Sequence, residues 1–134
     1  MNHSNIGPIT AENYRQRKGD ISLYLSTSVM LLGLDLNNID IVIMVRPMNM
    51  LHYIVQAAGR GGRNMGNGQR RRVLFYLLWN KNDIGNNVPG MSTAMKEFCE
   101  TQDCLKKVLK SHFGFMNSYS LDPGWCCSNC IGVV

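Results

Sequence analysis

The chain has 134 residues, which is enough for one domain or for one domain with a small appendage. Its hydrophobic content of 45% argues against global disorder, and its net charge of +5 suits an anionic partner such as nucleic acid. The longest apolar run, residues 41–45, is too short to cross a bilayer, and no signal peptide is visible. For the five cysteines we therefore expect reduced thiols or a metal site rather than a secreted disulfide framework.

The first part of the chain predicts helices and strands in alternation. Residues 11–17 form a short helix in this interpretation, and residues 21–26 form a strand with alternating apolar side chains. Residues 39–45 are a near-continuous, β-branched apolar run, which is typical of a strand buried on both faces in a parallel sheet. Residues 73–78 predict a third strand. Such alternation indicates an α/β layered fold.

A helix is expected over residues 50–58, between the last two strands. Apolar side chains recur at helical spacing in this segment and predict one buried face. That face consists of Leu51, Ile54, Val55 and Ala58. The following ten residues, 59–68, include five glycines and predict a loop.

The character of the sequence changes after residues 80–90, which are rich in Asn, Gly and Pro. We place a domain boundary there, between residues 1–85 and residues 86–134. The second domain contains two expected helices, over 91–98 and 105–113. The expected ends of the second helix are Thr101 or Asp103 as its cap and Gly114 as its stop.

The strongest candidate site follows the helix over 50–58, where the sequence reads Q-A-A-G-R-G-G-R. Gln56, Arg60 and Arg63 form a potential anion-binding fork, because a guanidinium donates two parallel hydrogen bonds to phosphate and keeps its charge. Glycines beside the arginines permit a close backbone approach to a ligand. The alternative is two arginines on a flexible surface loop.

A second candidate site is the stretch S-T-S-V-M-L-L-G-L-D at residues 26–35. Alone, it is compatible with an ordinary strand, turn and helix. It resembles motif V of superfamily 2 helicases, and the arginine stretch resembles motif VI. The two motifs occur here in the order that is typical of these helicases. The resemblance implies that Arg60 and Arg63 are arginine fingers at the ATP γ-phosphate and that Gln56 orders the nucleotide cleft. It also implies that Thr27 contacts the DNA backbone and that Gly33 and Asp35 couple the bound DNA to the ATP cleft.

The third candidate site is formed by cysteines near the end of the chain. The Cys127-x-x-Cys130 spacing allows two thiolates to bind one metal ion, and tetrahedral zinc needs four N or S ligands. Cys104 and Cys126 bring the number of thiols to four, with Cys99 or a residue beyond the chain end as an alternative fourth ligand. Free reduced cysteines are the other interpretation. The region resembles the zinc-binding module of RecQ helicases, which ends in a C-D-N-C-like pair.

The three sites together resemble the C-terminal part of a RecQ-type helicase. Gly61 and Asn64 depart from the usual G-R-A-G-R-D, and we expect Gly61 to loosen the loop. The resemblance implies a RecA-like second lobe, with a parallel sheet flanked by helices, followed by a small helical zinc module. Another superfamily 2 motor, such as a DEAD-box RNA helicase, usually has H-R-I-G-R-x-x-R and no cysteine module.

The function implied is ATP-dependent 3′-to-5′ unwinding of DNA, in recombination, repair or a mobile element. The implied cofactors are ATP with Mg²⁺ and a structural Zn²⁺, and the implied partners are single-stranded DNA, duplex junctions and a first helicase lobe, with no membrane. The expected location is the nucleus in a eukaryote and the cytoplasm otherwise. The alternative is a non-catalytic, zinc-stabilised DNA-binding module from a degenerate helicase copy.

The sequence contains no G-x-x-x-x-G-K-[ST] and no D-E-x-H-type acidic motif, which supply phosphate binding, Mg²⁺ coordination and water activation. We therefore expect a fragment, a degenerate copy or half of a split enzyme. The purified chain is predicted to release no measurable phosphate from ATP, with or without DNA. Robust DNA-stimulated hydrolysis by the pure chain would contradict this interpretation.

Overall fold

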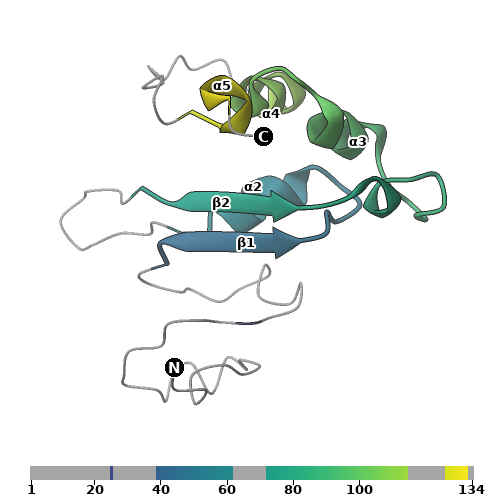
Figure 1. The fold of residues 1–134 in the computed structure, drawn as a ribbon, viewed down its shortest axis with the longest axis horizontal. Helices are drawn as coiled ribbons and strands as arrows, with labels where there is room; N and C mark the ends of the chain where they lie inside the picture. The colour runs from purple at the N-terminus through teal and green to yellow at the C-terminus, as the bar shows by residue number, and fades with distance from the viewer. Residues whose placement is uncertain (1–24, 26–38, 62–71, 115–125, 133–134) are drawn as a thin grey trace. The chain divides into compact units, whose positions relative to one another are not determined.

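The structure is a computed structural model. The residues that it describes are 25, 39–61, 72–114 and 126–132 (Figure 1). Two compact units are distinguished: one comprises residues 1–42 and 56–74, and the other comprises residues 43–55 and 75–134. The expected helix over 11–17 lies outside the described residues, as does the expected strand over 21–26 apart from Leu25, which forms a β-bridge.

The described sheet consists of two parallel strands, β1 (Ile41–Val45) and β2 (Leu74–Leu78), which run in the same direction in Figure 1. The Leu74 amide donates to the Asp40 carbonyl at 3.0 Å, and the Arg46 amide donates to the Leu78 carbonyl at 2.8 Å. The connection between the strands includes helix α2 (His52–Ala58). A parallel pair needs such a crossover, so the segment is a strand, helix, strand unit as the sequence predicted.

The prediction that β1 is buried on both faces is wrong. Burial alternates along both strands, and the outward side chains are between 43% and 71% exposed. These outward residues are Ile41, Ile43, Val45, Leu74, Tyr76 and Leu78. Met44, Phe75 and Leu77 lie on the opposite face and pack against the core. Within the described residues, core packing involves one face of the sheet, so the strands show the period of two that is typical of a half-covered sheet.

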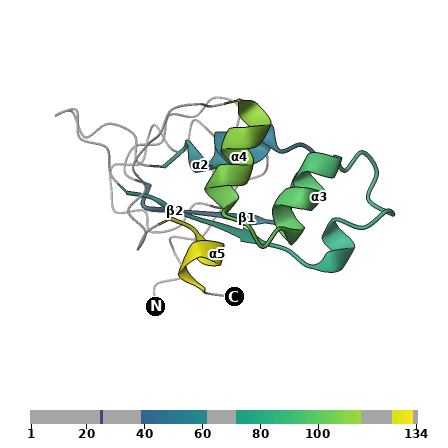
Figure 2. The ribbon, with the colours of Figure 1, turned by 90° about the horizontal axis from the view of Figure 1, so that it is seen from above.

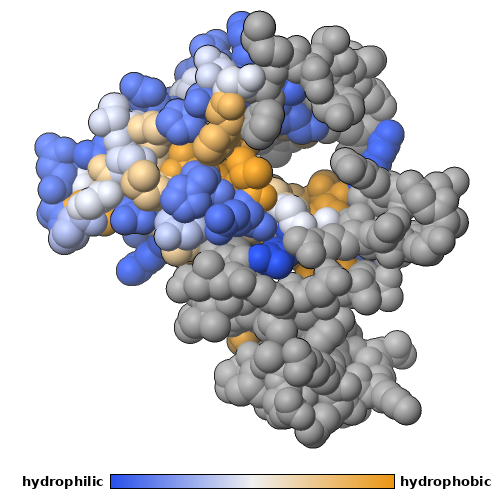
Figure 3. Space-filling model, turned by 180° about the vertical axis from the view of Figure 1, so that it is seen from behind, coloured by the Kyte–Doolittle hydropathy of each residue, from blue (hydrophilic) through white to orange (hydrophobic). Residues whose placement is uncertain are grey.

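The core is formed by Leu51, Ile54, Met95 and Phe98, each at most 5% exposed. The last two lie on α3 (Thr93–Glu100). Helix α4 (Leu105–Phe113) adds partly buried side chains, which are Leu105, Val108, Leu109 and Phe113. Figure 3 shows apolar residues reaching the surface among hydrophilic ones.

The buried face of α2 differs from the expected one. Val55 is 41% exposed, whereas Ala57 is buried. Leu51, Ile54 and Ala57 are spaced three residues apart and so share a face, while Val55 lies beyond it.

Helix α4 has the predicted bounds and ends at Gly114, whose φ of 69° is the left-handed conformation that glycine adopts without strain. Its predicted cap is wrong: Cys104 occupies the N-cap position. Thr101 is already the C-cap of α3, and its hydroxyl accepts a hydrogen bond from the Asp103 amide at 3.1 Å. None of the described helices is long and apolar enough to span a membrane.

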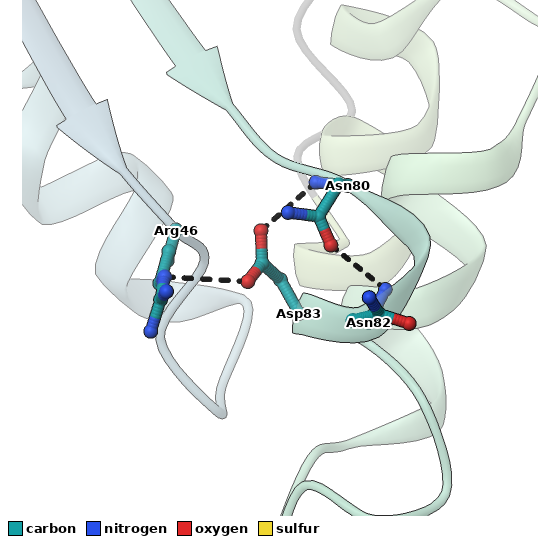
Figure 4. Close-up of polar contacts among 4 residues, drawn as sticks. All are labelled: Arg46, Asn80, Asn82 and Asp83. Carbon is teal, nitrogen blue, oxygen red and sulfur yellow. Dashed lines mark hydrogen bonds and ion pairs between the residues drawn. The ribbon is translucent and has the colours of Figure 1, made fainter.

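A polar network lies where β1 and β2 end (Figure 4). Arg46 has a φ of 67°, which is uncommon for a non-glycine residue and costs on the order of 1–3 kcal/mol. Its Nε lies 3.3 Å from a carboxylate oxygen of Asp83 in the short helix η3 (Lys81–Asp83). An exposed ion pair stabilises a fold by about 0–1 kcal/mol, so this pair does not fully offset the strain. Asp83 also accepts the Asn80 amide at 2.9 Å, which completes a capping box.

The core predicts a sharp contrast between two neighbouring positions of α2. Ile54→Ala removes a side chain that is 2% exposed and should lower the free energy of unfolding by about 2–5 kcal/mol, because a cavity remains. Val55→Ala, at 41% exposure, is the matched control and should cost less than about 1 kcal/mol. Urea unfolding at a fixed zinc concentration measures both. Equal losses would contradict the assignment of the buried face.

Candidate metal centre

Four cysteines are placed by the starts of two helices and the residues around them. Cys104 is the N-cap of α4, and Cys127 is the N-cap of α5 (Ser128–Ile131). Cys126 directly precedes this cap, and Cys130 lies within α5. Figure 2 shows α5 beside the end of α4 at which α4 begins. The fold therefore brings thiols that are more than 20 residues apart in sequence to one place.

The distances between the four sulfur atoms fit a tetrahedral metal ion. All four lie within 4.8 Å of one another. The Sγ of Cys104 is 3.4 Å from that of Cys126 and 4.0 Å from that of Cys127, and the Sγ atoms of Cys127 and Cys130 are 3.5 Å apart. A zinc ion with four Zn–S bonds of about 2.3 Å requires sulfur separations of about 3.8 Å. The cysteines are unpaired by disulfides, so the cluster can hold a metal ion.

Asn129 fixes α5 to the loop between α3 and α4. Its side-chain amide donates to the Thr101 carbonyl at 2.9 Å and to the Asp103 carbonyl at 2.8 Å. The Asp103 carbonyl directly precedes Cys104, so these bonds set the position of Cys127 and Cys130 relative to Cys104. Sequence reasoning missed Asn129, although its place between the two cysteines of the Cys-x-x-Cys pair was a usable signal.

Backbone amides favour the thiolate form at two of the sulfurs. Burial raises the pKa of Cys127, but the Leu105 amide, which donates to its Sγ at 3.4 Å, and hydrogen bonds shared with Cys130 and Cys104 lower it to about 7. For Cys104, too, burial is outweighed, here by the amides of Lys107 and Lys106 and by the neighbouring thiols, so its pKa is lowered. A thiolate is the form that binds a metal ion.

The other two thiols hold their protons more tightly. The pKa of Cys130 is raised to about 12 by its hydrogen bonds to Cys127 and Cys104. Burial, followed by the contact with Cys104, raises the pKa of Cys126. Two thiols of the cluster therefore have lowered pKa values and two have raised ones, because the thiols share hydrogen bonds and burial disfavours the charged form. A divalent cation at the centre would favour the charged form of each sulfur and allow all four to bind as thiolates.

Cys99 and His112 lie apart from this cluster. Cys99 packs against the core from α3, and burial together with the Glu100 charge raises the pKa of its thiol to about 11. It is not among the cysteines that meet. His112 is exposed on α4 and makes an edge-on ring contact with Phe113.

The motor-site residues are only partly described. Gln56 is exposed in α2, and Arg60 is half-buried just after α2, with its amide donating to the Ala57 carbonyl at 3.1 Å. The structure does not bring these two into a described site. The other expected motor-site residues, Arg63, Thr27, Gly33 and Asp35, lie outside the described residues.

Packing explains why glycine stands at position 61, where the sequence departs from the usual motif. A Cβ atom at Gly61 would collide with the side chain of Val73. Glycine therefore makes room for the residue that precedes β2, whereas the sequence suggested only a looser loop.

Comparison with known families agrees with the helicase motifs. Residues 10–65 match the family described as the helicase conserved C-terminal domain, and this range contains both stretches that resemble motifs V and VI. The match supports a superfamily 2 helicase C-terminal lobe for this part of the chain. No curated protein and no solved structure matches the chain significantly.

The sulfur geometry predicts about one zinc ion per chain. Elemental analysis of protein purified without chelator should find it, and Cys127→Ser with Cys130→Ser should lose it, because the two remaining thiols cannot close a tetrahedral site. Cys99→Ser is the matched control and should retain full zinc. Zinc retained by the double variant, or absent from the unmodified chain, would contradict the site. Zinc lost on Cys99→Ser but kept on Cys126→Ser would assign the fourth ligand to Cys99.

Proposed function

We propose that the chain supplies the second motor lobe and a structural zinc module to a RecQ-type, ATP-dependent 3′-to-5′ DNA helicase. The observation that carries the proposal is a helicase C-terminal domain at residues 10–65 followed, in the same chain, by four converging cysteines at residues 104–130. The domain supports a helicase in general. The cysteine cluster after it favours the RecQ type, because a DEAD-box motor usually has no such module.

In this proposal the segment after α2 faces the ATP bound mainly by a first lobe. Arg60 and Arg63 donate to the γ-phosphate oxygens as negative charge develops there, and Gln56 orders the cleft. Thr27 touches the DNA backbone, and Gly33 and Asp35 couple that contact to the cleft. Closing and opening of the two lobes then moves single-stranded DNA and separates the duplex.

Zinc has a structural role in this proposal. Four thiolates fill a tetrahedral coordination shell and leave no open position for substrate or water. Cys104, Cys126, Cys127 and Cys130 would hold the ion, which would fix α5 to the start of α4. The amides around Cys104 and Cys127 support the thiolate charges.

Arginine-finger chemistry is tested in a protein that joins a RecQ first lobe to this chain. Arg63→Ala should lower the turnover number for ATP by about 10³-fold, because one charge-stabilising group leaves the transition state. DNA affinity should change little. Arg72→Ala removes the same charge outside the motif and serves as the control.

An unchanged turnover number for Arg63→Ala would contradict the finger assignment. A joined protein that binds DNA but never hydrolyses ATP would instead identify the chain as a non-catalytic, zinc-stabilised DNA-binding module.

A further inference from the structure

The two parallel strands end at a shared polar edge in the unit of residues 43–55 and 75–134. β1 is followed by Arg46 and β2 by Trp79 and Asn80, and the Arg46 amide is bonded to the Leu78 carbonyl at 2.8 Å. The exposed Lys81 follows in η3. In parallel α/β sheets the carboxyl ends of the strands are where ligands bind. A ligand-binding residue is therefore expected at this edge.

Among the residues that the structure describes, the guanidinium of Arg46 is paired through one nitrogen, and its side chain is mostly exposed. Its Nε pairs with Asp83 at 3.3 Å, which is the one contact of the guanidinium drawn in Figure 4. The Arg46 side chain is 77% exposed, whereas that of Asp83 is 9% exposed. The Asn80 amide also donates to the Asp83 carboxylate, at 2.9 Å. The negative charge is thus recessed and engaged, while the positive charge faces solvent.

Stability alone does not account for an arginine at this position. Its φ of 67° favours glycine, and the following Pro47 further restricts the backbone of the residue before it. The side chain gains little by burial because it is mostly exposed. Backbone strain combined with an oriented, solvent-facing charge is the kind of outlier that points to a ligand.

We propose that Arg46 binds a backbone phosphate of single-stranded nucleic acid, with the Lys81 ammonium supplying a second positive charge at the same edge. A guanidinium with two terminal nitrogens available matches a phosphodiester, which offers two oxygens to a bidentate donor. The choice of nucleic acid as the ligand rests on the proposed helicase function.

The test measures binding of the zinc-loaded full chain to a fluorescent oligo-dT by anisotropy, over a range of salt concentrations. Arg46→Gly should weaken binding about 5-fold near 0.1 M salt and reduce the slope of log K against log salt by about 0.7, the effect of one lost phosphate contact. Its thermal midpoint should be unchanged or higher, because glycine relieves the φ strain.

Lys107→Ala is the matched control, since it removes one exposed positive charge from α4. It should leave the salt slope unchanged. Equal losses in Arg46→Gly and Lys107→Ala would show an effect of net charge alone and overturn the inference, as would unchanged binding of Arg46→Gly. An unmodified chain that binds no oligonucleotide would contradict the proposed function itself.

Discussion

The contact among four sulfur atoms is the interaction on which the C-terminal part of the structure depends. Helix α5 has four residues and no buried side chain, and α4 also has no fully buried residue. So short a helix has no stability of its own in water. What holds α5 is the sulfur cluster and the two hydrogen bonds from Asn129. A metal ion bound there would contribute folding free energy directly.

The two helices that precede α5 in the second unit, α3 and α4, also complete the core. Met95 and Phe98 of α3 share one buried cluster with Leu51 and Ile54, and α4 packs its apolar side chains against it. The start of α4 is therefore anchored on one side by apolar packing and on the other by Cys104. The same helix therefore contacts both the cysteine cluster and the core.

Local sequence patterns predicted the strands and helices, but not which of their faces are buried. The β-branched run at β1 and the left-handed stop at Gly114 are properties of the sequence itself, so both strands and the bounds of α4 were predicted correctly. The exposure of the outer face of the sheet was not predicted, because a continuous apolar run does not reveal whether a second layer covers the strand. The placement of Cys126 rather than Cys99 beside Cys104 depends on the chain path between distant segments. The ion pair of Arg46 with Asp83 likewise joins segments that are distant in sequence.

The position of Asn129 also makes it vulnerable to chemical ageing. Its nitrogen, and not its oxygen, faces the Thr101 and Asp103 carbonyls. Hydrolysis of the amide would replace two donors with a carboxylate that can only accept hydrogen bonds. Three oxygen-bearing groups would then face one another, next to thiolates that already repel. A single deamidation, which changes the mass by about one dalton and leaves every cysteine in place, would thus detach α5 from the loop before α4 and leave the sulfur cluster without its second support.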